Sequence, residues 1–314
     1  MKHLVVINPK SGYVVKNYSA LTAEISKAFA GLDYELYETT SPKDLTSYLE
    51  KRFAKDNELT RVYVCGGDGT IQEAISGLVG KDNVELAILP AGTGNDFVKI
   101  YGATNATIGE YRNFESLISG SPISIDISKI DGPSLESPLY SLNVINFGFD
   151  AIVGAKGNAN KLKGKSNPYG FKNAILPAIL KGRFNKIVVT ADGKQLNRKK
   201  LLLCSLAQGQ WVGGEYHASP KSNNTDGLID VVILKTMTLF GLLLKMFNKY
   251  KAGEHLDNPK LAKKIIYTRA KNIKIESPKD IDICVDGEII NGKSFTVDII
   301  PHGIKIIPPA PIKK

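Results

Sequence analysis

The strongest chemical signal in the sequence is a glycine-rich segment, residues 66–70 (GGDGT), which follows an apolar run and precedes a helical pattern. Glycine lets a backbone approach a phosphate closely, and the free N–H groups at the start of a helix favour an anion. Asp68 adds a carboxylate that can act through a metal ion on a polyphosphate. The alternative is a tight strand-to-helix turn that needs glycine only for its shape.

A second glycine-containing segment follows the next apolar run, at residues 90–97 (PAGTGNDF). Neither segment has the Gly-Lys-Ser/Thr ending of a Walker loop or the glycine spacing of the dinucleotide fingerprint. Two such loops after neighbouring strands nevertheless favour a composite anion site over two unrelated turns.

A pair of carboxylates occurs at residues 286–288 (DGE). In an extended strand residues i and i+2 point to the same side, so Asp286 and Glu288 would face one cleft. One could accept a hydroxyl proton while the other orients the reacting group or a metal. Because Asp-Gly is also a common turn dipeptide, spacing alone leaves the hairpin turn about as good an interpretation.

Residues 225–227 (TDG) follow a Ser/Asn-rich lead-in at residues 222–224. Such a loop offers one carboxylate and several neutral oxygens, which suits a hard cation such as Mg²⁺. A plain turn is the alternative.

The first half of the chain must position the glycine loops. Short apolar runs alternate with helical patterns, which favours a doubly wound α/β sheet. In such sheets ligands bind at the carboxyl ends of the strands, where all the glycine loops would lie. The expected strands are at residues 4–7, 34–38, 62–65 and 86–89, and the expected helices at 21–29, 45–53, 71–79 and from Asn95.

After about residue 121 strand-like segments follow one another, which predicts a largely antiparallel β-sandwich. Asp192-Gly193 and Asn291-Gly292 are typical hairpin turns. Helical patterns interrupt this half at residues 169–180 and 239–250. We therefore expect an α/β nucleotide-binding domain at 1–122 and a β-sandwich substrate domain at 123–302. The tail, 303–314, can return to the first domain.

The sequence resembles the diacylglycerol kinase catalytic-domain family, especially its soluble bacterial lipid kinases. The resemblance covers nearly the whole chain, and the ordered set of motifs is very specific. The matching parts are residues 8–12 (NPKSG), Thr39 ahead of Pro42 and Asp44, 66–73, 89–97, 125–126 (ID), 146–150 (NFGFD), 225–230 (TDGLID) and 286–288.

The resemblance implies a two-domain fold with the nucleotide in the cleft between the domains. It implies ATP contacts from Asn8, Pro9, Lys10, Ser11, Gly12, Thr39, Gly66, Gly67, Asp68, Gly69, Thr70, Ile71, Gln72, Glu73, Thr93 and Asn95. Family members usually have Asn where Gln72 stands. Because Gln keeps the amide, we expect ATP binding to survive this departure.

The resemblance also implies an Mg²⁺ ion held by the Asp226 carboxylate and by backbone oxygens near Asn223 and Leu228. Asp68 and Asp126 would extend a network of water and metal toward the phosphates. The general base is placed within residues 286–288, with Glu288 favoured and Asp286 as its partner or replacement. The implied reaction is Mg²⁺-dependent transfer of the ATP γ-phosphoryl group to a lipid hydroxyl, with diacylglycerol as the favoured acceptor.

The net charge of +10 indicates an anionic partner. Basic residues within 156–172, beside the apolar helix at 169–180, favour an anionic membrane surface over a solvated loop. No base-reading motif supports nucleic-acid binding. We expect a cytoplasmic protein that associates peripherally with membranes, and the resemblance makes a homodimer plausible.

Two rival functions are an NAD kinase-like enzyme and a non-catalytic lipid- or nucleotide-binding regulator. NAD kinases share the GGDGT loop, but they should lack the segment at 90–97. The retained acidic residues argue against the regulator. His3, His217, His255 and His302 show no metal-ligand spacing. His3 is expected at a strand edge and the other three on the surface or in turns.

Overall fold

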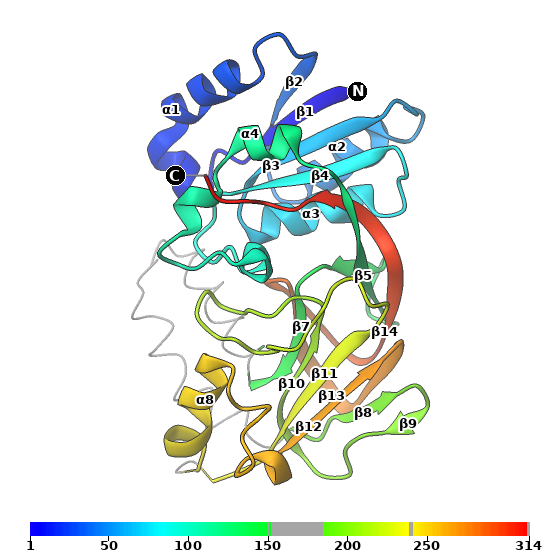
Figure 1. The fold of residues 1–314 in the computed structure, drawn as a ribbon. Coiled ribbons are helices and arrows are strands. Elements are labelled where there is room, and N and C mark those ends of the chain that lie inside the picture. The colour runs from blue at the N-terminus through cyan, green and yellow to red at the C-terminus, as the bar shows by residue number, and fades with distance from the viewer. Residues whose placement is uncertain (150, 152–184, 239–240, 313–314) are drawn as a thin grey trace. The chain divides into compact units, whose positions relative to one another are not determined.

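The computed structural model describes residues 1–149, 151, 185–238 and 241–312 (Figure 1). The chain forms two compact units, Met1–Ile127 with Pro301–Lys314, and Ser128–Ile300. The first unit thus ends at residue 127, where the sequence predicted 122, and resumes at residue 301, where the sequence predicted a tail from 303. The end of the chain belongs to the first unit.

The first unit is built on a parallel sheet with the strand order β2-β1-β3-β4, extended by the last residues of β14. The strands are β1 Lys2–Ile7, β2 Tyr34–Glu38, β3 Thr60–Gly66, β4 Val84–Pro90 and β14 Glu288–Ile307. β1, β3 and β4 are almost entirely buried, as their continuous apolar runs predict. His3 is therefore not at a strand edge: it lies in β1, between β2 and β3, and bonds Tyr63 Oη at 2.9 Å.

Helices cover the sheet of the first unit (Figure 1). They are α1 Gly12–Ala28, α2 Asp44–Arg52, α3 Asp68–Leu78 and α4 Phe114–Ser119, with short 3₁₀ helices at Phe97–Tyr101 and Ile108–Tyr111. α1 and α4 contribute side chains to one apolar core, which includes Phe29, directly after α1, and Phe114, at the start of α4. α2 and α3 pack against each other. The sequence signal for each helix is the spacing of its buried residues, such as Leu21 and Ile25 in α1.

The second unit is an antiparallel β structure, in which β12, β11, β10, β7, β13 and β14 are neighbours in that order. Its strands, besides β14, are β5 Ile123–Asp131, β6 Leu139–Ser141, β7 Val144–Gly148, β8 Val188–Ala191, β9 Lys194–Gln195, β10 Leu201–Ala207, β11 Ile229–Lys235, β12 Ile265–Ala270 and β13 Asn272–Val285. A core that includes Phe147 and Phe295 fills its interior. The predicted fold class, an α/β unit followed by a β-sandwich-like unit, is confirmed.

One local expectation for the second unit is wrong. Asn291 and Gly292 are not a hairpin turn, because both pair with β13 inside β14. The hairpin turn is Asp286-Gly287, where both residues have positive φ, 46° and 102°, and Val285 pairs with Glu288. Mirror-image turns of this kind match the twist of the strands they join.

A second apolar layer covers one side of the β structure. It includes α8, Phe247–Ala252, preceded by a π-helical turn at Leu242–Met246, and a 3₁₀ turn at Ala262–Lys264. Leu242, Met246 and Tyr250 are buried in this layer, so the described part of the predicted helix at 239–250 packs into the core. The predicted basic segment 156–172, the helix at 169–180 and Asp150 lie outside the described residues. No described helix is long and apolar enough to cross a bilayer.

His255 lies in a turn, one of the two expected places, but it is not at the surface, because its side chain is fully buried. Burial lowers its pKa to about 4. The folded state thus favours the neutral imidazole. The contribution of His255 to the free energy of unfolding is therefore full above the unfolded pKa of about 6.5 and is lost as the pH falls toward 4.

We expect acid to destabilise the protein partly through His255. Between about pH 7.5 and pH 4.5 its protonation should remove roughly 2 to 3 kcal/mol from the free energy of unfolding. Urea unfolding at both pH values measures this for the wild type, His255→Leu and the exposed control His302→Asn. The leucine variant should lose that part of the pH dependence and the control should keep it. An unchanged pH dependence in His255→Leu would contradict the assignment.

Candidate functional site

The loops that follow β1, β3 and β4 meet at the carboxyl edge of the parallel sheet. The backbone N–H of Tyr13 donates to the Ala91 carbonyl at 3.0 Å, and the N–H of Ala91 donates to the Gly66 carbonyl at 2.9 Å. The three loops predicted from sequence are therefore joined by backbone hydrogen bonds. This is the edge at which doubly wound sheets bind ligands.

Two glycines set the distance between the second and third loops. A Cβ atom added to Gly92 would lie 2.5 Å from Gly67 Cα, and one added to Gly67 would lie 3.0 Å from Gly92 Cα. A Cβ on Gly66 would lie 2.5 Å from Thr70 Cβ. These positions need glycine because backbone or a packed side chain fills the space that a Cβ would take.

Side-chain amides hold the loops in shape. Asn8 Nδ2 donates to Thr70 Oγ1 at 2.8 Å, which ties the first loop to the first turn of α3. Asn95 is buried at a φ of 48°, accepts from the Gly92 N–H and donates to the Gly92 carbonyl, each at 2.8 Å. Asparagine tolerates this left-handed backbone better than most residues, which explains its place in the loop.

A hollow of about 120 Å³ lies beside these loops. It is lined by Asn8, Lys10, Thr39, Thr40, Ser41, Pro42, Thr70 and Glu73. Five of these were predicted as ATP contacts, and the structure brings them together from three segments of the chain. Thr40 and Ser41 were missed, although they directly follow Thr39. Pro9, Ser11, Gly12, Thr93 and the rest of 66–70 belong to the adjoining loops.

Two predicted contacts in α3 have side chains turned elsewhere. Ile71 is buried in the apolar interior of the first unit. Gln72 is also buried, and its amide nitrogen lies 3.3 Å from Ser76 Oγ, one turn further along the same helix. The side chain of Gln72 is therefore engaged within α3, and the unusual Gln is accommodated there by a helical i, i+4 contact.

Asp68, in the first turn of α3, receives a hydrogen bond from the backbone N–H of Asp96 at 2.8 Å. Asp96 in turn pairs with the buried ammonium of Lys99 at 3.0 Å. This ion pair was missed by sequence analysis, although its i, i+3 spacing is a recognisable signal. Asp126 is fully buried, and its carboxylate accepts the backbone N–H of His302 at 2.9 Å.

Asp286 lies in the turn between β13 and β14, which is the hairpin-turn alternative for this segment and not the extended strand that would set two carboxylates side by side. Its carboxylate accepts the Ser141 hydroxyl at 2.8 Å and the backbone N–H groups of Leu142, Asn143 and Val144 at 2.9, 3.4 and 2.8 Å. Burial raises its pKa to about 6, and these hydrogen bonds oppose the rise. These bonds lie at the break between β6 and β7.

Glu288 follows the turn and lies opposite Val285 at the start of β14. Its side chain is half-buried, and it has no hydrogen-bond or ion-pair partner within the described ranges. Of the two carboxylates predicted to be catalytic, Asp286 is held by four hydrogen bonds, and Glu288 by none to its side chain among the described residues.

The predicted metal loop precedes β11. Asp226 Oδ1 accepts the Leu228 N–H at 3.1 Å, and Oδ2 pairs with the exposed Arg269 at 3.3 Å. Asn223 bonds Thr225 through its side chain. No three His, Cys, Asp or Glu side chains among the described residues gather closely enough to hold a metal ion.

A second carboxylate, Asp230, lies beside Asp226. It is fully buried, contacts Tyr267 Oη at 2.5 Å and Arg269 Nε at 3.5 Å, and its Oδ2 has no partner among the described side chains and backbone. Burial raises its pKa. Hard oxygens and an orphaned buried acceptor fit a divalent cation, which would displace the exposed guanidinium. Arg269 was missed because it is far from Asp226 in sequence and reaches it through the β11–β12 pairing.

Two family models together match most of the chain. Residues 2–130 match the family model described as the diacylglycerol kinase catalytic domain, and residues 143–308 match the YegS C-terminal NAD kinase beta sandwich-like domain. The chain belongs to the diacylglycerol kinase catalytic-domain family. The resemblance noted in the sequence is thereby confirmed.

Relatives of this family member are named diacylglycerol kinase in several bacteria. One from Bacillus subtilis (strain 168) is 26% identical, with 90% of this chain and 88% of the relative covered. One from Mycobacterium tuberculosis (strain H37Rv) is 25% identical, with 98% and 95% covered. A crystal structure of a diacylglycerol kinase from Bacillus anthracis (strain Sterne) shares the fold, with a TM-score of 0.66, 21% identity and coverage of 98% and 96%.

Proposed function

We propose that this family member transfers the γ-phosphoryl group of ATP to a lipid hydroxyl, with diacylglycerol as the acceptor and phosphatidic acid as the product. The observation that carries the proposal is the backbone contact between Gly67 and Gly92. It joins two glycine loops into one edge at which backbone N–H groups can surround a phosphate chain.

The residues at this edge bind and orient the nucleotide in the proposed reaction. α3 begins at Asp68, so the positive end of its dipole lies at this edge. Lys10, exposed at the hollow, adds an ammonium group that donates to the Thr40 carbonyl at 3.4 Å. Phosphoryl transfer depends mainly on positioning and charge neutralisation, which these groups supply.

Glu288 accepts the proton of the lipid hydroxyl in this proposal. A carboxylate without a structural partner can take up a proton, whereas that of Asp286 is committed to four hydrogen bonds. We therefore assign proton acceptance to Glu288 alone and a structural role to Asp286.

Asp226, with the carbonyl oxygens of Asn223 and Leu228, would hold Mg²⁺, and the neighbouring Asp230 oxygen would complete the ring of hard donors. A bound divalent cation neutralises charge and fixes the loop that carries its ligands. Asp68 and Asp126 belong to the same proposal as residues linking the metal toward the phosphates. A cytoplasmic location, peripheral contact with an anionic membrane and a homodimer are also part of it.

The test is phosphorylation of a panel of lipids by purified protein with γ-labelled ATP and Mg²⁺ in mixed micelles. The panel holds diacylglycerol, a polyprenol, a sphingoid base and phosphatidylglycerol, with NAD⁺ in a separate reaction. We expect label in diacylglycerol. Glu288→Gln should lower kcat by about 10²- to 10⁴-fold, as the loss of a general base does.

The matched control is Glu136→Gln, which removes another charge from an exposed glutamate and should retain full activity. Label in a different lipid would support lipid kinase activity but contradict diacylglycerol as the acceptor. Label in NAD⁺ alone would favour the NAD kinase-like alternative suggested by the second family model. No label in folded, ATP-binding protein would favour a non-catalytic regulator, and an active Glu288→Gln variant would remove Glu288 from the mechanism.

A further inference from the structure

The second unit carries a concentration of positive charge at one end of its sheet. β-strand register brings four segments there: Asn185 bridges Leu201 at the start of β10, Leu201 pairs with Lys235 at the end of β11, and Leu234 pairs with Ile265 at the start of β12. We call this surface the basic end. Its cations are Lys186, Arg198, Lys199, Lys200, Lys235, Lys263 and Lys264.

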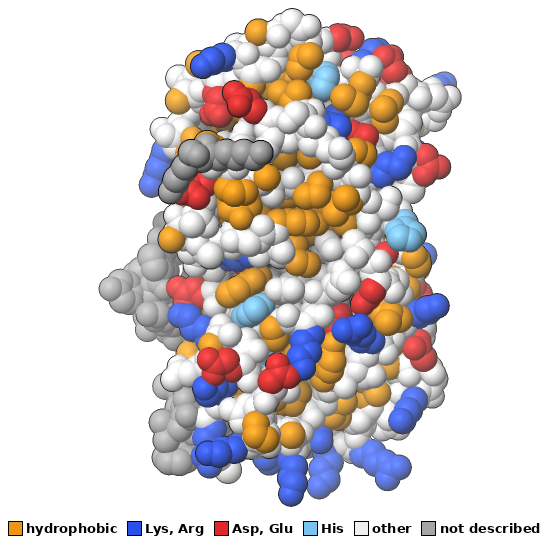
Figure 2. Space-filling view, viewed as in Figure 1, with side chains coloured by type: hydrophobic (Ala, Val, Ile, Leu, Met, Phe, Trp, Pro, Cys, Tyr) orange, Lys and Arg blue, Asp and Glu red, His pale blue; other side chains and the backbone are white. Residues whose placement is uncertain are grey.

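The charge of the basic end is not balanced locally. The segments 185–188, 197–201, 234–237 and 261–265 contain no Asp or Glu. Some lysines elsewhere in the unit pair with carboxylates, as Lys251 does with Glu215 at 2.6 Å and Lys274 with Glu276 at 2.8 Å. By contrast, no described carboxylate forms an ion pair with Lys186, Arg198 or Lys264. Figure 2 shows Lys and Arg side chains gathered over the part of this unit at the bottom of the view.

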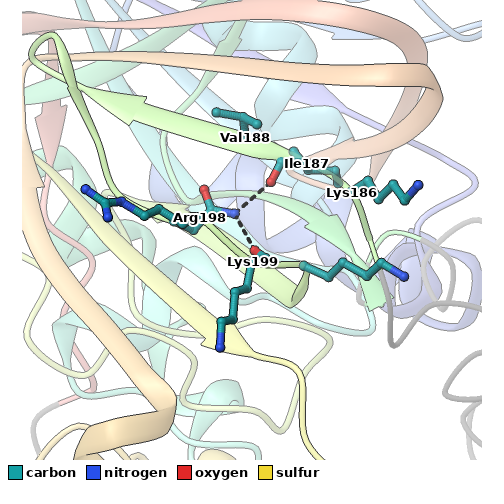
Figure 3. Close-up of a pocket in the computed structure, with 7 residues that line it drawn as sticks. Lys186, Ile187, Val188, Arg198 and Lys199 are labelled. Carbon is teal, nitrogen blue, oxygen red and sulfur yellow. Dashed lines mark hydrogen bonds between the residues drawn. The ribbon is translucent and has the colours of Figure 1, made fainter.

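Two of the four segments of the basic end, residues 186–188 and 197–200, line a surface hollow of about 380 Å³. The buried side chain of Asn197 fixes its wall by donating to the Ile187 and Lys199 carbonyls at 2.7 and 3.0 Å, the two bonds drawn in Figure 3. The side chains of Lys186, Arg198 and Lys199 spread away from the hollow in different directions (Figure 3). They are arranged to meet an extended anionic surface and not to enclose one small anion.

We propose that the basic end is the surface by which this protein binds the headgroups of an anionic phospholipid membrane. A bilayer offers many negative charges in one plane, to which spread lysines and arginines contribute additively. Nucleic acid is the less fitting partner, because these four segments contain no aromatic residue on which a base could stack. The choice of a membrane rests on the proposed lipid kinase function, since a diacylglycerol acceptor resides in one.

The experiment measures sedimentation of the full chain with vesicles of equal parts phosphatidylcholine and phosphatidylglycerol. The test variant is the triple Lys186→Gln, Lys199→Gln, Lys264→Gln, in which all three side chains are exposed. Each cation is expected to contribute about fivefold to vesicle affinity, so the triple should bind about 100-fold more weakly. Wild-type binding should fall with added salt and be absent on pure phosphatidylcholine.

The matched control is Lys27→Gln, Lys51→Gln, Lys55→Gln, which removes the same charge from exposed positions in the first unit. It should bind vesicles like the wild type. Equal binding by the two triples, or no binding by the wild type, would overturn the proposal. So would release from vesicles by inorganic phosphate, which indicates a small-anion site. A short RNA that binds more tightly than vesicles, and loses binding in the test triple, would assign the surface to nucleic acid.

Assaying lipid phosphorylation in neutral detergent micelles distinguishes a wrong assignment of the membrane surface from a wrong assignment of the kinase reaction. There the test triple should match the wild type in kcat if the basic end serves only membrane binding. A protein without kinase activity that still binds anionic vesicles through the basic end would retain the surface and lose the proposed reaction. If the kinase is active but the test triple binds vesicles as tightly as the wild type, the proposed reaction is retained and the proposed membrane surface is wrong.

Discussion

Asp286→Ala is expected to destabilise the protein by roughly 3 kcal/mol or more, because it leaves four buried donors without their acceptor. Those donors are the Ser141 hydroxyl and the N–H groups of residues 142–144, which belong to the break between β6 and β7. The carboxylate thus fastens the β13–β14 turn to a segment far earlier in the chain. Chemical unfolding in urea measures the loss.

Two further variants separate the causes. Asp286→Asn keeps the shape and tolerates the positive φ, but it turns an NH₂ group toward N–H donors, so it should be less stable than the wild type and more stable than Asp286→Ala. Ser141→Ala removes one of the four bonds and should cost about 1 kcal/mol. A stable but inactive Asp286→Ala protein would contradict the structural assignment and return Asp286 to the catalytic site.

The difference between Asp286 and Glu288 marks a limit of reading function from spacing. The Asp-Gly-Glu sequence fits an extended strand and a turn about equally well. The choice is made by positive φ at Asp286 and Gly287 and by partners near residue 143. The Asp-Gly dipeptide offers a local signal for the turn, but the hydrogen-bond partners are not encoded locally, because the acceptor groups of a turn find donors wherever the sheet brings them. Sequence alone therefore identified both carboxylates but not which one is free to react.

The sheet edge that carries the glycine loops was far more predictable, since it depends on local signals that agree. Apolar runs predicted buried parallel strands, and the topology of such sheets places the following loops at one edge. The burial of His255 and the contact of Arg269 with Asp226 had no comparable signal. A lone histidine shows no periodicity, and Arg269 reaches its partner only through the register of two strands. Long-range pairing, and not propensity, decides such contacts.

Gly92→Ala is expected to weaken ATP binding by about 100-fold, because a displacement of the order of 1 Å at a binding edge can have that effect. The new Cβ would lie 2.5 Å from Gly67 Cα, and backbone cannot move aside as a flexible side chain would. The two glycine loops must therefore separate. Titration calorimetry with ATP measures the affinity, and thermal unfolding shows whether the variant remains folded.

Gly69→Ala is the matched control in the same site. Nothing lies within 4 Å of its added Cβ, and alanine is favoured over glycine inside α3. The variant should therefore fold at least as well as the wild type. If it also binds ATP normally, the glycine requirement at this edge comes from loop-to-loop packing at Gly67 and Gly92. If the variant folds but no longer binds ATP, the phosphates approach the backbone of α3 directly at Gly69. Normal ATP affinity in Gly92→Ala would contradict the role given to the loop contact, because the edge would then tolerate separation of the loops that form it.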